Sequence, residues 1–396
     1  MKFLFILILC LSWLFEFFLW RIRKRQLHRP FPEDLPDYFD SQTKDLSVSY
    51  QEKTGDLRLI HVSVNHVLLL AIMGFDLVFH LVQIFSRWGF QEEAANVLAA
   101  FLLAIPFFVN GTVKSAKQVF SVNEKHGMNR TTPRKFLLDV LRSGFFLFLL
   151  LGVSTYFIIE GSSQGASLVS LLYFISLVIN QRLAFKMTPL PDSGLKTRIL
   201  QFCEDQHLRF RKILVLNASQ RSGQVNALFQ GFGRWSRIVL FDTLIEKLPE
   251  DEVMAIFAHE VGHAKNRDQR KLILPIILLT IISTILYVSV SKSMSVARAF
   301  GFPEPNPVLS FVLMFSLWTP FWIALSILRN PRSRRGEIRA DQFAAKEMGK
   351  AVTIDALIAI TRTNLGVQNP HPVDEFLFST HPPLHQRIQG INKVPD

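Results

Sequence analysis

Residues 271–290 read KLILPIILLTIISTILYVSV, a run of twenty residues that is long and apolar enough to cross a bilayer as a helix. Just before this run, residues 257–266 read FAHEVGHAKN, with two histidines four residues apart and a glutamate after the first. In a helix, residues at i and i+4 lie on one face, about one turn apart. The two stretches together predict a helix with metal-binding side chains at the surface of a membrane.

The composition of the whole chain agrees with membrane embedding. Of the 396 residues, 49% are hydrophobic and 36 are phenylalanine, and the mean hydropathy is +0.25. These values are higher than is usual for a soluble protein of this size. Apolar runs near twenty residues predict about seven membrane spans. We place them at 3–20, 60–85, 94–112, 143–160, 166–185, 271–290 and 308–328.

The basic residues predict the orientation of these spans. The first span is preceded by Lys2 alone and followed by RIRKRQLHR (21–29), which is typical of a retained anchor rather than a cleaved signal. With the N-terminus outside, four of the 44 lysines and arginines fall in outer segments. The other 40 lie inside or at the inner helix ends. The net charge of +12 therefore indicates a cytoplasmic face and no nucleic-acid partner.

The spans divide the chain into four predicted segments. Residues 1–185 form an N-terminal membrane region with five spans, and residues 271–328 contain two more. Residues 186–270 form a cytoplasmic segment with an α+β pattern, because β-branched runs such as KILVLNAS and RIVLFDTL predict strands before the histidine helix. Residues 329–396 form a second cytoplasmic segment that begins with a helix. The predicted fold is mainly α, a polytopic membrane protein with a cytoplasmic α+β domain.

The histidine motif is typical of a zinc site. His259 and His263 can present imidazole nitrogens to one ion, and Glu260 lies beside them as the candidate general base. A catalytic zinc ion uses three protein ligands and one water. The helix after the last span supplies Glu337 as a third ligand, and Asp341, one turn later, can orient a ligating histidine. One Zn²⁺ ion held in this way predicts hydrolysis of peptide bonds.

Several longer stretches resemble one known family. They are VFSVNEKHGMNR (119–130), SGQVNALFQGFGRWSRIVLFDTL (222–244), FAHEVGHAKN (257–266), SRRGEIRADQFA (333–344) and STHPPLHQRI (379–388). In this order, and over essentially the whole chain, they resemble the CAAX prenyl proteases of type I and related bacterial peptidases, which are integral-membrane zinc endopeptidases. The resemblance implies a barrel of seven helices around an intramembrane chamber, closed on the cytoplasmic side by the zinc domain.

The resemblance also implies roles for single residues, with the zinc ligands and the general base as above. Asn226 matches the segment that pairs with substrate backbone as an added strand. His381 and Arg387 match positions beside the site, and His381 could donate to the oxyanion that forms on the scissile carbonyl. The chain departs from the family at one position. Where the usual helix reads Glu-Tyr-Gln-Ala-Asp, Arg339 brings a cation, which we expect to alter substrate preference.

The expected substrate is a peptide or protein that is prenylated at its C-terminus or inserted in the lipid bilayer, cleaved at the cytoplasmic face. A quality-control metalloprotease of membrane proteins is a second hypothesis, although five spans before residue 200 favour the prenyl-protease architecture. A transporter or receptor with a structural zinc ion is a third, and it is disfavoured because structural sites usually have four protein ligands. Compact loops favour a bacterial inner membrane, with the endoplasmic reticulum as the location in a eukaryote.

Overall fold

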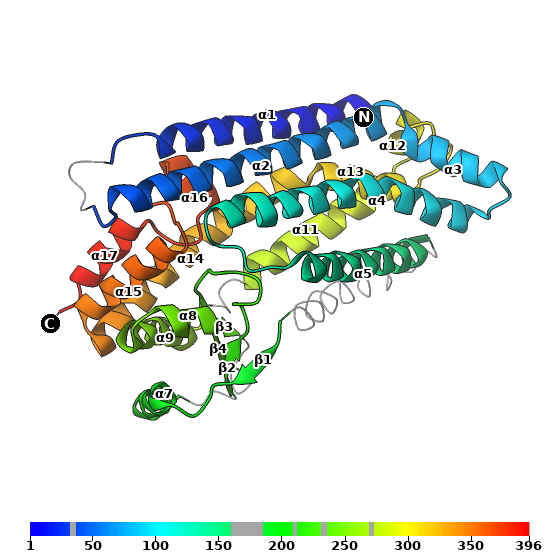
Figure 1. Ribbon diagram of the computed structural model, residues 1–396. Helices are drawn as coiled ribbons and strands as arrows, with labels where there is room; N and C mark the ends of the chain where they lie inside the picture. Colours follow the sequence, from blue (N-terminus) through cyan, green and yellow to red (C-terminus); the bar gives the residue numbers. More distant parts are fainter. Residues whose placement is uncertain (32–36, 160–184, 209–211, 231–235, 269–272, 396) are drawn as a thin grey trace.

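The computed structural model describes residues 1–31, 37–159, 185–208, 212–230, 236–268 and 273–395. Its membrane part is a bundle of long helices that run roughly side by side (Figure 1). The helices of this part are α1 (Lys2–Leu27), α2 (Ser41–Gly74), α3 (Leu77–Arg87), α4 (Glu92–Lys117), the π-helix η1 (Gln118–Asn123), α5 (Pro133–Ile159), α11 (Ile273–Ser291), α12 (Met294–Ala299), α13 (Pro307–Ser316) and α14 (Trp318–Met348).

Four of the described helices are long and apolar enough to cross a membrane. The count rises to five if α13 and α14, which are bent by 51° where they meet, form one span. Six of the seven predicted spans overlap described helices. The other, 166–185, lies outside the described residues except for its last position. The prediction of a mainly helical, polytopic membrane fold is confirmed by these helices.

One predicted span is broken rather than continuous. The run 60–85 contains the end of α2 and most of α3, and the chain turns at Asp76, whose φ is 50°. The carboxylate of Asp76 lies 2.9 Å from the ammonium group of Lys2 at the start of α1. A carboxylate among apolar helices needs such a partner, because an unpaired charge there is costly. The ion pair joins the break to the first helix.

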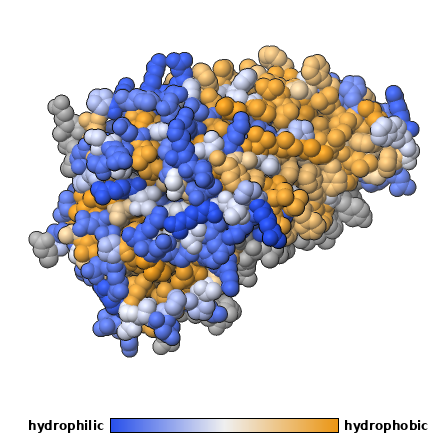
Figure 2. All heavy atoms as spheres, in the orientation of Figure 1, coloured by the Kyte–Doolittle hydropathy of each residue, from blue (hydrophilic) through white to orange (hydrophobic). Residues whose placement is uncertain are grey.

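Apolar side chains cover the membrane part of the surface. Figure 2 shows hydrophobic residues over the helical bundle and hydrophilic residues gathered at the end of the molecule that carries α15 (Lys350–Thr363) and α17 (Leu384–Asn392). Large apolar residues such as Phe3, Leu14 and Phe145 are exposed on the bundle. Such a broad apolar surface is expected where helices face lipid.

The polar end of the molecule contains a small mixed sheet. Its strands are β1 (Met187–Pro189), β2 (Lys212–Leu216), β3 (Ala227–Gln230) and β4 (Arg237–Phe241), in the spatial order β1-β2-β4-β3. Strands β2 and β4 are parallel, and β1 and β3 pair antiparallel with them. The runs KILVLNAS and RIVLFDTL form β2 and β4, as their β-branched residues predicted. Strand β3 lies at one edge, so one side of its backbone is not paired with any other strand of the described residues.

Helices pack around this sheet and form the core that positions the site. They are α7 (Gly194–Asp205), α8 (Asp242–Lys247), α9 (Glu250–Lys265), α15, α16 (Pro372–Phe378) and α17. Phe257 of α9 is fully buried with Ile238 and Leu240 of β4. The opposite side of α9 packs against α14, which continues from the membrane through the predicted segment boundary at residue 329. Helix α14 therefore joins the membrane bundle to the polar end.

Candidate metal centre

Helix α9 presents the two motif histidines toward α14. The helix begins after Pro249, and its first turn contains three acidic residues, which the positive end of the helix dipole favours. Apolar residues on one side of α9, including Phe257 and Val261, are fully buried in the core beside the sheet. This packing leaves His259 and His263, one turn apart, on the side that meets α14.

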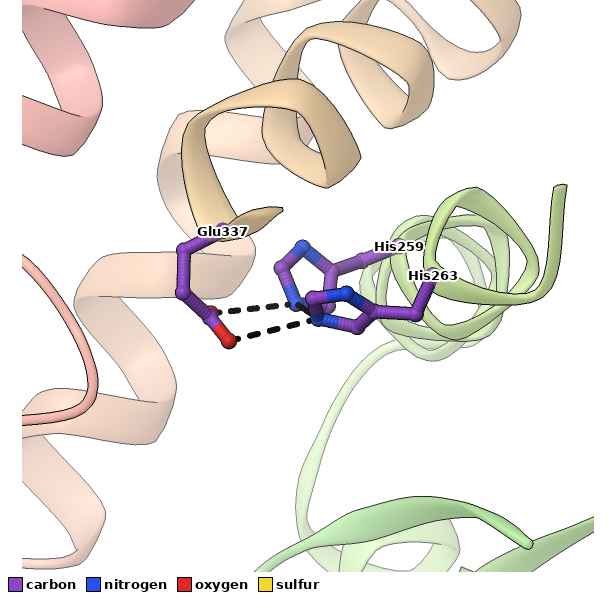
Figure 3. A group of neighbouring side chains, drawn as sticks. All are labelled: His259, His263 and Glu337. Carbon is purple, nitrogen blue, oxygen red and sulfur yellow. Dashed lines mark hydrogen bonds and ion pairs between the residues drawn. The ribbon is translucent and has the colours of Figure 1, made fainter. Parts of the chain in front are cut away.

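Three side chains from α9 and α14 converge (Figure 3). One ligand atom from each of His259, His263 and Glu337 lies within 4.8 Å of the others. The Nε2 atoms of the two imidazoles are 3.1 Å apart, and they lie 3.5 Å and 3.3 Å from the carboxylate oxygens of Glu337. One imidazole can donate its N–H to the other nitrogen in this arrangement, and the same two nitrogens and the carboxylate can instead surround one metal ion. This donor set fits Zn²⁺, which prefers imidazole and carboxylate ligands.

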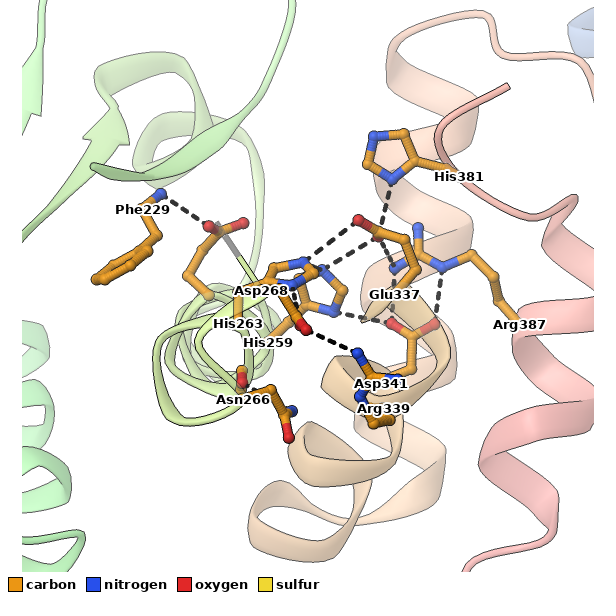
Figure 4. Close-up of polar contacts among 12 residues, drawn as sticks. Phe229, His259, His263, Asn266, Asp268, Glu337, Arg339, Asp341, His381 and Arg387 are labelled. Atoms are coloured by element: carbon orange, nitrogen blue, oxygen red, sulfur yellow. Dashed lines mark hydrogen bonds and ion pairs between the residues drawn. The ribbon is translucent and has the colours of Figure 1, made fainter. Parts of the chain in front are cut away.

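The other nitrogen of His259 faces a buried carboxylate. Its Nδ1 atom lies 2.8 Å from Oδ1 of Asp341, whose side chain is 0% exposed. Arg387 of α17 donates two hydrogen bonds to Asp341, from Nε over 2.8 Å and from Nη2 over 2.6 Å (Figure 4). The predicted orienting residue, Asp341, therefore contacts both His259 and the predicted arginine. A histidine held in this way keeps Nε2 turned toward the cluster.

His263 has a comparable neighbour that the sequence did not reveal. Its Nδ1 atom lies 3.2 Å from Oδ2 of Asp268, and Arg339 donates a hydrogen bond of 2.7 Å to Oδ1 of the same carboxylate. Asp268 lies beyond the end of α9, where helical spacing no longer predicts the direction of a side chain. The sequence offered only one sign of this contact, namely that the carboxylate of Asp268 follows His263 by five residues.

Glu260 lies between the histidine cluster and the edge of the sheet. The backbone N–H of Phe229 in β3 donates a hydrogen bond of 2.8 Å to Oε2 of Glu260. Burial raises the pKa of Glu260, although the nearby imidazoles of His259 and His263 oppose the shift. The open edge of β3 thus faces the carboxylate expected to act as the base.

The remaining predicted residues lie at different distances from the cluster. The Nδ1 atom of His381 is 2.7 Å from Oε2 of Glu337, and its side chain is 63% exposed, so it forms the rim of the site. Asn226 is exposed at the start of β3, and its side-chain oxygen accepts a hydrogen bond from the backbone N–H of Ala227. Among the hydrogen bonds of the described residues, Asn226 contacts Ala227 and Phe241 and not the cluster.

The electrostatic environment favours a bound cation. Burial alone would lower the pKa of His259, but Asp341 and Glu337 outweigh it and raise that pKa to about 9. Burial would likewise lower the pKa of His263, but Asp268 and Glu337 outweigh this effect and raise that pKa to about 10. Burial would raise the pKa of Glu337, yet the neighbouring imidazoles hold it well below its usual range. The carboxylates therefore stabilise positive charge between the imidazoles, whether a proton or a metal ion carries it.

Gly262 allows α9 and α14 to approach closely enough for this geometry. A Cβ atom at Gly262 would lie 2.9 Å from Cα of Ala340, a separation that forces one helix to move. We expect Gly262→Ala to weaken zinc binding, because overpacking of this kind costs about 1–3 kcal/mol and separates the ligands. Zinc content after dialysis measures the effect. Gly111→Ala in α4 is the control, since a Cβ there meets no atom within 4 Å, and equal zinc retention in both variants would contradict the prediction.

Comparison with known proteins agrees with this geometry. Residues 189–394 match the model of the family described as Peptidase family M48. The chain belongs to this family. Residues 21–189 match a second model, described as CAAX prenyl protease N-terminal, five membrane helices. The M48 match contains the histidine motif, the strand β3 and the helix that carries Glu337. The protein is therefore a multi-pass membrane metallopeptidase, and the family assignment replaces the transporter or receptor hypothesis.

Relatives of this M48 peptidase cover most of its length. A CAAX prenyl protease 1 homolog of Arabidopsis thaliana is 32% identical over 294 residues, which are 70% of this chain and 69% of that protein. The homolog from Mus musculus is 28% identical and aligns with 98% of this chain and 95% of its own. The crystal structure of S. mikatae Ste24p has a TM-score of 0.83 at 23% identity, and the match covers 99% of each chain. The likeness to Ste24p confirms the predicted fold class.

Proposed function

We propose that this M48 peptidase holds one zinc ion through His259, His263 and Glu337 and hydrolyses peptide bonds at the cytoplasmic face of its membrane. The observation that carries the proposal is the convergence of three ligand atoms within 4.8 Å, two from α9 and one from α14. Membership of a peptidase family supplies the reaction class. The proposed inner location is supported by the lysines and arginines, of which 40 of 44 are expected on that side or at inner helix ends.

In the proposed mechanism, bound zinc would polarise the scissile carbonyl and lower the pKa of a water molecule. Glu260 takes a proton from that water and later delivers it to the leaving amine. Its burial supports this role, because a carboxylate with a raised pKa accepts a proton near neutral pH more readily. The N–H of Phe229 holds one carboxylate oxygen in place, which leaves the other oxygen of Glu260 for the water.

Substrate backbone would bind along the open edge of β3. The edge lies next to Glu260 through the contact with Phe229, so a peptide added there as a strand would pass the base. Asn226 at the start of β3 is exposed and available to such a peptide. His381 at the rim could donate to the oxyanion as the carbonyl is attacked. Arg387 acts behind the site, through its two hydrogen bonds to Asp341.

A cavity inside the helical bundle supports a substrate with a lipid or membrane-inserted part. It has a volume of about 630 Å³ and is lined by α2, α4, α5 and α13. Most of its lining is apolar, with residues such as Leu69, Phe107 and Phe311. Cavities of this size hold small-molecule ligands. We propose that it receives the prenyl group of a C-terminally prenylated peptide, in agreement with the names of the relatives.

A panel of peptides tests the substrate proposal. The full-length protein in detergent or liposomes is given a farnesylated peptide, the same peptide without the lipid, and an unmodified transmembrane peptide. We expect cleavage of the farnesylated peptide to be favoured at least about tenfold in kcat/KM, because burial of each CH₂ group contributes about 0.8 kcal/mol. Equal turnover of all three would remove the prenyl preference and favour the quality-control hypothesis.

A further inference from the structure

We propose that Asp268 and Arg339 form a positioning pair for His263, equivalent to the pair that Asp341 and Arg387 form for His259. The inference rests on the proposed zinc site, adds Asp268, which no sequence motif assigned, and gives Arg339 a further role. In Figure 4 each of the two carboxylates is joined by dashed lines to one imidazole and to one guanidinium group. We call the first pair the Asp268–Arg339 clamp.

The distances in the two pairs correspond. Nδ1 of His263 lies 3.2 Å from Asp268, and Nδ1 of His259 lies 2.8 Å from Asp341. The guanidinium of Arg339 lies 2.7 Å from Asp268, close to the 2.6 Å that separates the guanidinium of Arg387 from Asp341. When Nδ1–H of an imidazole donates to a carboxylate, the lone pair stays on Nε2. The clamp therefore favours the tautomer of His263 that can ligate a metal.

The backbone brings Asp268 to this position. Helix α9 ends at Lys265, and two residues later Arg267 adopts a left-handed conformation with φ of 54°. A residue in this conformation after a helix reverses the direction of the chain. Asp268 consequently turns back toward His263, and only 14% of its side chain is exposed. Limited exposure keeps water from competing strongly for the carboxylate.

Helix α14 is shaped to receive this carboxylate. A Cβ atom at Gly336 would lie 3.1 Å from Oδ2 of Asp268, so the missing side chain at this position leaves the space that the carboxylate occupies. The next residue, Glu337, is the proposed ligand, and Arg339 binds Asp268 from the same helical turn. Arg339 was expected to alter substrate preference. Its hydrogen bond to Asp268 adds a role in the support of His263.

Zinc affinity of the full-length protein tests the clamp. We expect Asp268→Asn to weaken zinc binding about 10- to 100-fold, the range for carboxylates that orient ligating histidines. Gly336→Ala should act in the same direction, because the added methyl group displaces the carboxylate. Arg339→Gln should have a smaller effect of up to about fivefold, since its side chain is 39% exposed. Competition with a chelator measures each dissociation constant.

The visible spectrum of cobalt-substituted protein gives a second readout, because it responds to the geometry of the ligands. A change in this spectrum for Asp268→Asn separates positioning from a general loss of stability. Asp251→Asn is the matched control: Asp251 lies on α9 with the two histidines and also pairs with an arginine, Arg198 of α7, but its side chain is 65% exposed. We expect the control to keep both the affinity and the spectrum.

The outcomes distinguish the clamp from the zinc site itself. A wild-type protein that takes up no stoichiometric zinc would overturn the proposed function. Normal zinc binding in the wild type together with unchanged affinity and spectrum in Asp268→Asn would overturn the clamp alone. If Asp268→Asn does not fold, Arg339→Gln decides, because an unchanged spectrum and affinity in that exposed variant would reject the pair. Combining both substitutions should add little to Asp268→Asn, since Arg339 acts through Asp268.

Discussion

Glu260→Gln is expected to keep about one zinc ion per chain and to lower peptidase activity about 10²- to 10⁴-fold, the usual contribution of general acid–base catalysis. The amide cannot take a proton from water, but its oxygen can still accept the hydrogen bond that Phe229 donates to this side chain. The fold and the ligands should therefore persist. Zinc content and initial rates on the best peptide substrate measure the two effects in the same preparation.

Glu252→Gln is the matched control for this experiment. Glu252 lies two turns earlier on α9, and burial also raises its pKa, with the charge of Asp355 contributing. Within the described residues it forms no ion pair with any of the three proposed ligands. Activity close to wild type is expected for Glu252→Gln. Full activity in Glu260→Gln would show that another group acts as the base.

Glu337→Ala is expected to lower zinc affinity at least about 100-fold and to reduce peptidase activity to background. The substitution leaves two imidazoles for an ion that takes three protein ligands in catalytic sites. It also removes the acceptor that lies 2.7 Å from His381 and the negative charge that neutralises the cluster. Zinc content after dialysis and activity with added zinc measure the loss.

Chelation of the wild type supplies the comparison. The chelated wild type should recover activity when one equivalent of zinc is returned, whereas Glu337→Ala should not. Glu347→Ala, near the end of the same helix, controls for the loss of a carboxylate from α14, because Glu347 accepts a hydrogen bond from Gln206 away from the cluster. Retention of stoichiometric zinc by Glu337→Ala would assign the third ligand elsewhere.

Much of the site could be predicted because its residues lie on regular helices. The i, i+4 spacing of His259 and His263, and of Glu337 and Asp341, places each pair on one helical face whatever the tertiary structure is. Apolar runs located the membrane spans for the same reason, since hydropathy and length are local properties. The strands β2 and β4 followed from β-branched residues. These features depend on neighbours in the sequence.

The features that could not be predicted depend on contacts between distant residues. The break at Asp76 is stabilised by Lys2, 74 residues away. Asp268 reaches His263 only because Arg267 reverses the chain and α14 leaves space for it. Hydropathy also underestimated the lengths of the helices. Helix α2 begins at Ser41, well before the apolar run at 60–85. Helices that leave the bilayer continue as polar segments, which a search for apolar runs does not detect.

The continuity of α14 has a practical consequence for anyone who wishes to work with this peptidase in aqueous buffer. One helix of 31 residues carries exposed tryptophans at its beginning and the proposed third ligand further along, so truncation cannot separate the proposed catalytic residues from the membrane helices. A fragment restricted to the polar segment 186–270 would bring two histidines and a base but an incomplete coordination sphere. Purification in detergent or nanodiscs is thus the route by which an intact catalyst can be obtained.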